Sequence, residues 1–519
     1  MRVDYVYIQD FKNLKEFEID LDETFLDSVI LGRNALGKSN FIEALVLIFK
    51  FLDLQKKPPF SYTIKYECRD KNIEIQYNKT YSFFINGQKL KTQKEFFENK
   101  NEYLPKNVFT YYSGTSNRLE EHFDDHQKKF YDRIIKEDVS QDEVDDLRKL
   151  FYVRLIHSYF VLLSFFSFND EESQKSREFI SEYLGIEDIE SILFVLKKPS
   201  WTGKDDPRFW GATGVVKEFL EKVWDYSIAP IYHKENTRID FRRSTDQEKL
   251  FLYISNKEKL QQLANDYKNN TEFFKALEST YISDLIADVR VKVKKRNIDG
   301  AITFRELSEG EQQLLTVLGL LKFTKDKETL VLLDEPDTHL NPRWKWEYLR
   351  MIHEVIGDDK TTHIILNTHD PLLIGGMVKE QVRIFRNDSK SKKIIAAVPD
   401  VDPRGLGVAG ILTSELFGLS TTLDPETMEL LNKKNDLAYK QSKSKLNDKE
   451  NQELRSISEE LNKLGFTKTF RDPLYQKFVM ALATRKELEG NQSLSMENRK
   501  EADKIALEIL EEIFEEELE

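Results

Sequence analysis

The sequence predicts an α/β protein: a mixed β-sheet flanked by helices, with an antiparallel β layer, a large helical insertion and a helical C-terminal region. Three observations predict this fold class. A glycine-rich loop, residues 32–39, separates a strand-like apolar run from a helical apolar run. Two short apolar runs, 330–334 and 363–366, each end in polar residues far along the chain. Between loop and runs lies a long segment, residues 117–284, whose pattern is mostly helical.

The composition is that of a folded protein with an acidic, strongly ionic surface. The chain has 519 residues, of which 40% are hydrophobic and 33% are charged, and its formal net charge is −13. This length predicts two or three domains. The charge argues against a protein coated all over by nucleic acid, although a local basic surface is compatible with it.

The cysteine content and the apolar runs indicate the compartment. One thiol, Cys68, can form neither a disulfide framework nor a cysteine-ligated zinc site within a chain. The first residues, MRVDYVYIQD, carry acids and have no long apolar core, so we expect no signal peptide. The most apolar run, 151–168, is interrupted by Arg154 and His157, and its clean part is too short to span a bilayer. We therefore expect a cytoplasmic protein with no membrane partner.

Residues 1–116 are predicted to form the first lobe of the α/β core. Alternating apolar residues predict two strands joined by the turn DFKNLK, followed by a buried strand in SVILG. Renewed alternation over 61–90 predicts a small antiparallel layer, in which Asn86 and Gly87 form a hairpin turn.

The rest of the chain is predicted to form three regions. Residues 117–284 are expected to be a helical insertion that is rich in aromatic side chains. Residues 285–400 return to strand patterns and are expected to form the second lobe of the core. Residues 401–519 are charged and helical in pattern, which predicts a helical C-terminal region.

The loop GRNALGKS fits the pattern G-x-x-x-x-G-K-[ST] and stands between a predicted strand and a predicted helix, the context that this phosphate-binding motif requires. Its glycines let backbone N–H groups approach phosphate oxygens, and the helix N-terminus adds partial positive charge. We expect Lys38 to reach the β- and γ-phosphates of ATP and Ser39 to ligate Mg²⁺. The predicted nucleotide-binding residues here are Gly32, Arg33, Asn34, Ala35, Leu36, Gly37, Lys38, Ser39 and Asn40.

Two acids follow the apolar run LVLL. A parallel strand beside the strand of the loop would bring Asp334 and Glu335 to the sheet edge where ligands bind. We expect Asp334 to hold Mg²⁺ and Glu335 to orient or deprotonate the water that attacks the γ-phosphate. One strand later, ILNTHDP places His369 at the same edge, where it is predicted to contact the γ-phosphate. A purely structural histidine is the alternative there.

The stretch LSEGEQQ precedes these acids. By itself it reads as a helix N-terminus, in which Ser308 is the cap and Glu311 completes a capping box. The same arrangement suits a phosphate, because Ser308 carries a hydroxyl, Gly310 permits close backbone approach and the helix dipole favours an anion. The stretch therefore predicts a second phosphate-binding element, far in sequence from the first.

LSEGEQQ resembles the signature motif of ABC-type ATPases, commonly LSGGQ. The order of phosphate loop, insertion, signature, acids and histidine is similar to the Rad50, RecF, SMC and OLD branch of that family. The resemblance implies an ATPase head that pairs with a second copy, so that each ATP lies between one phosphate loop and the partner's Ser308 and Gly310. It also implies that Asp337 lies in a D-loop coupling the two sites. The family's Q-loop glutamine has no counterpart in TYYSGTSNRL, and which residue replaces it stays open.

Softer segments suggest what the ATPase serves. FVLLSFFSF and ILTSELFGLSTTLDPET resemble the PtuA-type ATPases of Septu and some retron systems, whose partner is an HNH nuclease, PtuB. The resemblance implies a homo-oligomeric ATPase of bacterial antiphage defence that controls a partner nuclease and has no nuclease of its own. DNA or retron msDNA is a further candidate partner.

Two alternatives stay open. One is a DNA-repair ATPase similar to RecF or Rad50 that binds DNA directly; the basic strand 290–296 itself suits local sensing of nucleic acid under the main reading, and it fits a solvated sheet edge equally well. The other is an OLD-like ATPase with its own nuclease, to which Asp400 and Asp402 would contribute acids. His122 and His126, in HFDDH, have the spacing of metal ligands, although a solvated helix face is the preferred reading.

Overall fold

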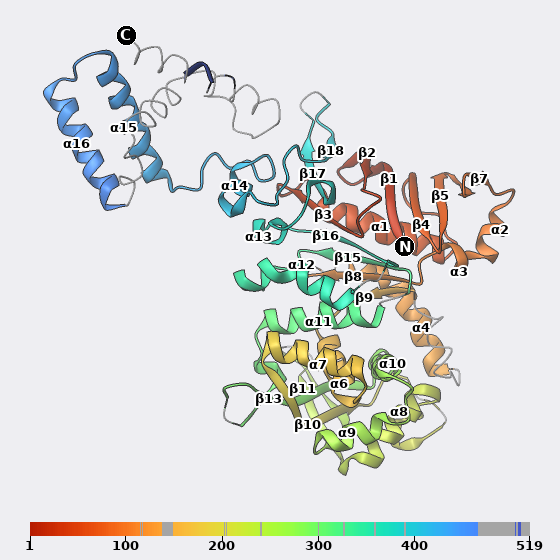
Figure 1. Cartoon of the computed structure of the whole chain (residues 1–519). Coiled ribbons are helices and arrows are strands. Elements are labelled where there is room, and N and C mark those ends of the chain that lie inside the picture. The colour runs from red at the N-terminus through yellow and green to blue at the C-terminus, as the bar shows by residue number, and fades with distance from the viewer. Residues whose placement is uncertain are drawn as a thin grey trace. The chain divides into compact units, whose positions relative to one another are not determined.

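The computed structural model divides the chain into two compact units (Figure 1). One unit comprises Met1–Leu373 with Phe385–Ala396, and the other comprises Ile374–Ile384 with Ala397–Glu519. The structure describes residues 1–114, 116, 118–136, 149–201, 203, 205–238, 241–298, 300–324, 327–357, 360–388, 391–464, 504 and 507–509.

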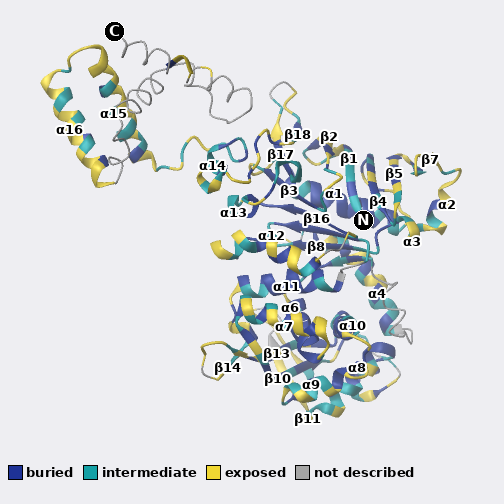
Figure 2. Cartoon of the chain, viewed as in Figure 1, coloured by how far each residue is buried: buried dark blue, intermediate teal, exposed yellow. Residues whose placement is uncertain are grey.

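The central sheet has seven strands. They are β3 (Asp27–Gly32), β8 (Asn107–Tyr112), β9 (Leu150–Tyr152), β15 (Thr329–Asp334), β16 (Thr362–Asn367), β17 (Val382–Asn387) and β18 (Ile394–Ala397). Their order is β18-β17-β3-β16-β15-β8-β9, and the pairs from β3 to β9 run parallel. Parallel strands covered on both faces read as continuous apolar runs. β15 and β16 accordingly are buried at every position, as the dark blue ribbons of Figure 2 show.

The parallel register places the site residues at one edge of this sheet. Asp334, the last residue of β15, is level with Asn367 of β16 and Tyr112 of β8. The chain continues from β3 through the phosphate loop into α1 (Lys38–Asp53). The carboxyl ends of parallel strands and the N-terminus of the following helix therefore meet, as the sequence predicts.

A six-stranded antiparallel sheet shares a core with α1. Its strands are β1 (Arg2–Phe11), β2 (Leu14–Asp20), β4 (Tyr62–Cys68), β5 (Lys71–Asn78), β6 (Thr80–Ile85) and β7 (Gln88–Lys89), in the order β2-β1-β4-β5-β6-β7. Phe49 of α1 packs edge-on against Tyr66 of β4, with ring centroids 5.7 Å apart. Asn86 and Gly87 have φ values of 49° and 78°, the positive angles that a two-residue hairpin turn needs. The predicted antiparallel layer and its hairpin are confirmed.

The insertion differs from its prediction, because it contains a sheet as well as helices. Strands β10 (Ile186–Lys197), β11 (Ile228–Arg238) and β12 (Ser244–Ile254) fall inside 117–284 and join β13 (Ile286–Lys295) and β14 (Ala301–Thr303) in the antiparallel order β11-β12-β10-β13-β14. Its helices are α4 (Asp124–Lys136), α6 (Ile156–Ser167), α7 (Glu171–Leu184), α8 (Gly214–Tyr226), α9 (Lys257–Ala264) and α10 (Asn270–Ile282), with 3₁₀ turns η1 (Glu120–Phe123) and η2 (Pro207–Phe209). Short apolar runs such as ILFVL suit a buried strand and a buried helix equally, so periodicity alone misses the strands.

The basic strand of the sequence analysis is β13, and it is an interior strand of this sheet. Val289, Val291 and Val293 are buried, whereas Arg290 and Lys292 alternate with them on the exposed face. β14 pairs with β13 only over Lys292–Lys294. The reading of this strand as a sheet edge is therefore wrong over Lys292–Lys294, which lie between β10 and β14, whereas Arg290 and Val291 pair with β10 alone among the described strands.

Further helices complete the first unit. Two of them, α11 (Glu309–Thr324) and α12 (Pro342–Ile356), fall within residues 285–400, the predicted second lobe. α11 packs on α6 of the insertion so closely that a Cβ on Gly319 would lie 2.1 Å from Cγ1 of Val161. The other elements are α2 (Gln93–Glu98), α3 (Lys100–Tyr103) and η3 (Phe304–Glu306). The junction with the second unit is the short helix α13 (Pro371–Ile374).

The second unit is helical, as predicted for its C-terminal part. It contains η4 (Lys379–Gln381), α14 (Gly407–Thr413), α15 (Pro425–Lys443) and α16 (Asp448–Lys463). α15 and α16 pack through a small core of Leu437, Ile457 and Leu461. Within the described residues, none of the helices has the length and apolar character needed to cross a membrane.

Candidate nucleotide site

The phosphate loop adopts backbone angles and close contacts that require glycine at two positions. Gly32 has φ 147°, and a Cβ there would lie 2.7 Å from the carbonyl oxygen of Phe385. Gly37 has φ 83° and is the N-cap of α1, with no side chain capping the helix. The first N–H groups of α1 therefore lack a side-chain acceptor, which is the arrangement that receives phosphate oxygens.

Lys38 lies inside the loop and reaches the end of β16. Its Nζ donates to the carbonyl oxygen of Gly32 at 2.8 Å and lies 2.8 Å from Nε2 of His369. Burial lowers the pKa of Lys38, and the nearby carboxylates of Glu335 and Asp334 oppose that shift. The ammonium group is thus drawn toward the acids of β15, where a phosphate would also be placed.

Asp334 is fully buried beside Ser39. Its Oδ1 accepts from Oγ of Ser39 at 3.1 Å and from Nδ2 of Asn367 at 3.2 Å. Its Oδ2 and the Oδ1 of Asn367 are buried without a hydrogen-bond partner among the described residues. Burial raises the pKa of Asp334, and the hydrogen bonds from Ser39 and Asn367 counter that effect.

These orphaned acceptors fit the predicted Mg²⁺. Carboxylate, amide and hydroxyl oxygens are the ligands that Mg²⁺ takes, and it is commonly held by one or two carboxylates together with substrate phosphates and water. Ser39, Asp334 and Asn367 are the side chains present to hold it. Asn367 was not among the predicted Mg²⁺ ligands, although its place at the end of the strand after β15 was a usable signal.

Glu335 follows β15 in a strained conformation that points it toward the loop. Its φ is 52°, and its backbone N–H donates to the carbonyl oxygen of Asn367 at 3.0 Å. Oε1 of Glu335 lies 3.1 Å from Nε2 of His369. Burial, and then the negative charge of Asp337, raise the pKa of Glu335 to about 7, against the opposing charge of Lys38. A carboxyl group with a pKa near neutrality is suited to general base chemistry.

His369 is neutral at physiological pH. Burial lowers the pKa of His369 to about 4, and the positive charge of Lys38 adds to this shift. The neutral ring therefore lies between an ammonium group and a carboxylate, with Nε2 facing both. From this place it can hydrogen-bond to a phosphate oxygen or a water molecule.

A pocket of about 280 Å³ collects the residues of the loop. Seven of the predicted loop residues line it, and Gly32 and Arg33 do not; the lining residues are Asn13, Asn34, Ala35, Leu36, Gly37, Lys38, Ser39, Asn40, Arg118 and His369. Two of these were not predicted. Asn13 lies in the turn between β1 and β2, and its amide donates to the carbonyl oxygen of Ala35 at 2.8 Å. Arg118 follows β8, whose end at the ligand-binding edge of the sheet was the available signal.

The signature stretch forms the predicted cap and lies outside that pocket. The backbone N–H of Glu311 donates to Oγ of Ser308 at 3.2 Å, and the N–H of Ser308 donates to Oε2 of Glu311 at 2.8 Å. A Cβ on Gly310 would lie 2.4 Å from the carbonyl oxygen of His339, so a larger residue does not fit. Ser308 is exposed, and neither residue lines the pocket of the phosphate loop. Within one chain, the two predicted phosphate-binding motifs do not share a pocket.

Asp337 is buried, and its carboxylate contacts two residues of the same chain. Its Oδ1 accepts from Oγ1 of Thr368 at 3.0 Å, and Nζ of Lys345 lies 3.9 Å from Oδ2. Burial raises the pKa of Asp337, and the hydrogen bond from Thr368 opposes that effect. Thr368 precedes His369, so Asp337 bonds to the residue next to the histidine that follows β16.

His122 and His126 do not form a solvated helix face, and the preferred reading of HFDDH is wrong. Nε2 of His122 lies 2.9 Å from Oε1 of Glu43, and Nε2 of the buried His126 lies 2.9 Å from Oδ2 of Asp53. Both carboxylates belong to α1, and the two histidines tie the start of the insertion to that helix. No group of three or more His, Cys, Asp or Glu side chains that could hold a metal ion occurs in the described ranges.

The acids considered for an OLD-like nuclease have other contacts. Oδ1 of Asp402 accepts from the backbone N–H of Lys379 at 2.8 Å. The backbone N–H of Asp400 donates to Oε1 of Glu415. Both interactions lie within the second unit.

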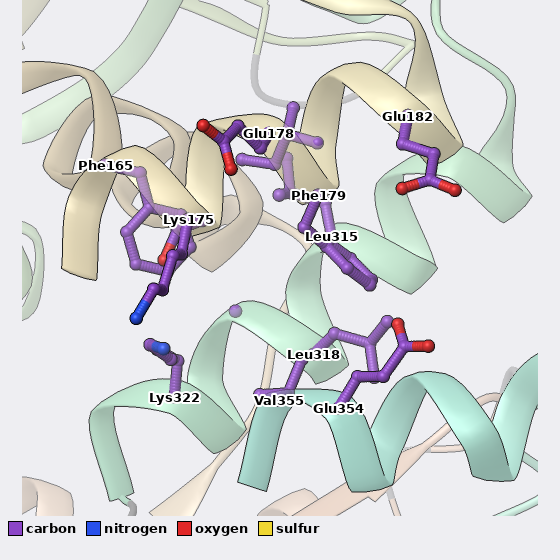
Figure 3. A pocket seen from close by; sticks show the side chains of 13 residues that line it. Phe165, Lys175, Glu178, Phe179, Glu182, Leu315, Leu318, Lys322, Glu354 and Val355 are labelled. Atoms are coloured by element: carbon purple, nitrogen blue, oxygen red, sulfur yellow. The ribbon is translucent and has the colours of Figure 1, made fainter. Parts of the chain in front are cut away.

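A separate cavity lies behind the signature helix (Figure 3). It measures about 310 Å³ and is lined by α7, α11 and α12, together with Phe165 of α6. Figure 3 shows Phe179, Leu315 and Leu318 facing its interior, with Lys175 and Lys322 at one end and Glu354 at the other. The cavity shares no lining residue with the pocket of the phosphate loop.

Comparisons with curated proteins give relatives that match part of the chain. The Septu protein PtuA of Bacillus mycoides (strain KBAB4) is 27% identical over 240 residues, which cover 44% of this chain and 32% of that protein. The Septu protein PtuA of Bacillus thuringiensis is 24% identical over 207 residues, covering 37% of this chain and 51% of the relative. A retron Vc95 probable ATPase of Vibrio cholerae serotype O1 biovar El Tor is 23% identical over 222 residues, which cover 38% of this chain and 41% of that protein. The matches thus span about half or less of each relative's length.

Solved structures of SMC heads align with most of the chain at low similarity. An SMC head bound to the C-terminal winged-helix domain of ScpA is 12% identical and covers 77% of this chain and 98% of its own, with a TM-score of 0.33. The SMC head domain from Thermotoga maritima is also 12% identical; the alignment covers 76% of this chain and 99% of that structure, with a TM-score of 0.30. Both TM-scores are too low to establish a common arrangement of elements.

A family model described as "AAA domain, putative AbiEii toxin, Type IV TA system" matches residues 28–375. The matched segment runs from β3, just before the phosphate loop, through the signature helix and β15 to α13. It therefore includes every residue of the candidate nucleotide site except Asn13. The chain belongs to this family of AAA-domain proteins and is related to the Septu PtuA proteins.

Proposed function

We propose that the protein binds Mg²⁺–ATP and hydrolyses it to ADP and phosphate. The observation that carries this proposal is the convergence of Lys38, Asp334, Glu335 and His369, from three separate segments, at the N-terminus of α1. Phosphoryl transfer needs positioning and charge neutralisation, and this edge of the sheet provides groups for both.

Each group has a proposed role. The uncapped N-terminus of α1 and Lys38 bind the phosphates. Ser39, Asp334 and Asn367 would hold Mg²⁺, which neutralises phosphate charge when it is bound. Glu335 takes a proton from the attacking water, and the neutral His369 hydrogen-bonds to the γ-phosphate.

We further propose that two chains complete each other's sites. Ser308 is exposed at a helix N-terminus but lies outside its own chain's phosphate pocket. A second copy that presents Ser308 and Gly310 to the nucleotide would use this cap as an anion-binding element. In this arrangement Asp337 would connect the facing surface to His369 through Thr368.

The cellular role belongs to the same proposal. We propose an ATPase of bacterial antiphage defence that acts in the cytoplasm; similarity to Septu PtuA proteins and to a retron probable ATPase supports the defence role. We propose that its nucleotide state controls a partner HNH nuclease, with DNA or retron msDNA as a candidate ligand of the assembly.

Phosphate release from ATP by the purified protein tests the enzymatic part. Wild-type protein with Mg²⁺ is expected to release phosphate, and Lys38→Ala is expected to lose at least about 100-fold in rate. Equal activity of both proteins would overturn the assignment. Co-purification with a candidate nuclease, followed by mass measurement, tests the proposed partner.

A further inference from the structure

Arg118 occupies the pocket of the phosphate loop, in the segment where the sequence offers no Q-loop glutamine. Its Nη2 donates to Oδ1 of Asn40 at 2.5 Å and to Oε2 of Glu43 at 2.8 Å. Its Nε is buried and has no hydrogen-bond partner in the part of the chain that the structure describes. A buried N–H of a guanidinium group is costly to leave unpaired. Arg118 lines this pocket, and its side chain is 32% exposed, so the guanidinium group can also donate to a ligand held there.

Glu43 holds the arginine in this place. Its carboxylate is buried on α1, makes ion pairs with Lys12 and Arg118, and lies 2.9 Å from Nε2 of His122. Burial by itself would raise the pKa of Glu43, but hydrogen bonds from His122, Lys12 and Arg118 lower it to about 2. Glu43 is therefore an anion at neutral pH, and a charge-assisted bond fixes the orientation of the guanidinium.

The cluster of Lys12, Glu43, Arg118 and His122 carries a net positive charge that can attract an anion. The single negative charge of Glu43 faces both Lys12 and Arg118, so the cluster is cationic even when His122 is neutral. Arg118 lines the same pocket as Lys38. Arg118 thus acts on the same small volume as Lys38 while approaching from a different segment of the chain.

We propose that Arg118 contacts the phosphates of the bound nucleotide, and that Glu43 is the positioning residue that presents it. This inference rests on the proposed binding of Mg²⁺–ATP and adds a second side-chain cation to that site. Arginine suits the task because its planar fork keeps one N–H group on Glu43 while another binds a phosphate oxygen. Arg118 and His122 both open the insertion, so the insertion gains a direct contact with the nucleotide.

Equilibrium binding of Mg²⁺–ATP tests the proposal, measured by calorimetry on full-length protein that carries Glu335→Gln to prevent turnover. Arg118→Ala is expected to raise Kd about 10- to 100-fold, the loss of a charge-assisted hydrogen bond. Arg118→Lys keeps the positive charge but loses the planar fork of the guanidinium, so its Kd should lie between those of the parent protein and of Arg118→Ala. The matched control is Arg154→Ala. Arg154 bonds to Glu120 and Gln127 in the same segment but does not line the pocket, so its variant should bind ATP normally.

The role of Glu43 is tested by a double-mutant cycle. Glu43→Gln should raise Kd, and adding it to Arg118→Ala should raise Kd little further, because both changes remove one interaction. Fully additive effects would overturn the positioning role.

The inference and the proposed function can fail separately. If Arg118→Ala binds Mg²⁺–ATP like its parent while Lys38→Ala loses binding, Arg118 has no phosphate role and the proposal is overturned. The same holds if Arg118→Ala lowers the apo-protein's Tm as Arg154→Ala does and leaves Kd unchanged, since its bonds would then be purely structural. If Lys38→Ala also binds normally, the nucleotide site itself is refuted.

Discussion

Nζ of Lys38 and Nε2 of His369 lie 2.8 Å apart, which joins the phosphate loop to the end of β16 across most of the chain. The contact places a cation beside an imidazole whose pKa falls to about 4 through burial and through that same charge. His369 is therefore neutral at physiological pH, and the titrating group of the site near neutrality is Glu335, whose pKa rises to about 7.

Glu335→Gln is expected to lower kcat for ATP hydrolysis about 100- to 10,000-fold, because the amide cannot accept the proton of the attacking water. Nucleotide binding should persist, since Lys38 and the N-terminus of α1 are unchanged. Phosphate release and equilibrium ATP binding measure the two effects. Hydrolysis at the wild-type rate would remove Glu335 from the mechanism.

The pH profile should follow the carboxyl group of Glu335. As pH falls through about 7 the base becomes protonated, so kcat/KM should fall about tenfold per pH unit below that value. His369, with its pKa near 4, should leave no second inflection above pH 5. A flat profile between pH 5.5 and 8 would contradict the assignment.

The same raised pKa has a consequence for stability. The folded protein holds the Glu335 proton at a pH where the unfolded chain has released it, so this group lowers stability as pH rises through the window from about 4.5 to about 7. Denaturant melts of wild-type protein and Glu335→Gln should diverge over that window, the wild type losing stability relative to the variant. Parallel curves would indicate an unshifted carboxyl group.

Asp334→Asn should raise the Mg²⁺ concentration needed for half-maximal hydrolysis. The amide removes a negative charge from the side chain whose Oδ1 accepts from Ser39 and whose buried Oδ2 has no hydrogen-bond partner among the described residues. Chelation of divalent cations should abolish turnover in both proteins. Phosphate release during a Mg²⁺ titration measures the shift, and an unchanged midpoint would exclude Asp334 as a ligand.

The composite site predicts complementation between inactive variants. Ser308→Arg blocks the signature and Lys38→Ala disables the phosphate loop, so each pure protein should be inactive. A mixed pair should contain one intact site, formed by the normal loop of one chain and the normal signature of the other. ATPase assays of each protein and of the mixture measure this. Full activity of Ser308→Arg alone would return the stretch to a simple helix cap.

Gly319→Ala should destabilise the first unit by about 1–3 kcal/mol, because its Cβ would overlap Val161 of α6. Gly376→Ala is the matched control, since a Cβ there has no atom within 4 Å among the described residues and no positive φ is recorded for it. Urea melts of the two variants measure the difference. Equal stability would show that α6 and α11 separate without cost.

The sequence by itself determined those local elements that depend only on residues adjacent in the chain. GRNALGKS between a strand and a helix predicts a phosphate loop because glycine backbone and helix N-terminus are local features. Ser308 and Glu311 predict a cap for the same reason, and the structure forms it. The parallel edge that gathers Asp334 and His369 also followed from apolar runs ending in polar residues.

Only the tertiary structure decided which distant groups meet. Arg118 and Asn367 reach the site through strand order: each follows or ends a strand of the parallel sheet, but only the order of the strands brings them to the phosphate loop. His126 is buried against Asp53 because α4 packs on α1, although its own sequence reads as a solvated face. The strands of the insertion were hidden for a related reason: a short apolar run records burial, and burial alone does not distinguish a strand from a helix until its partners are in place.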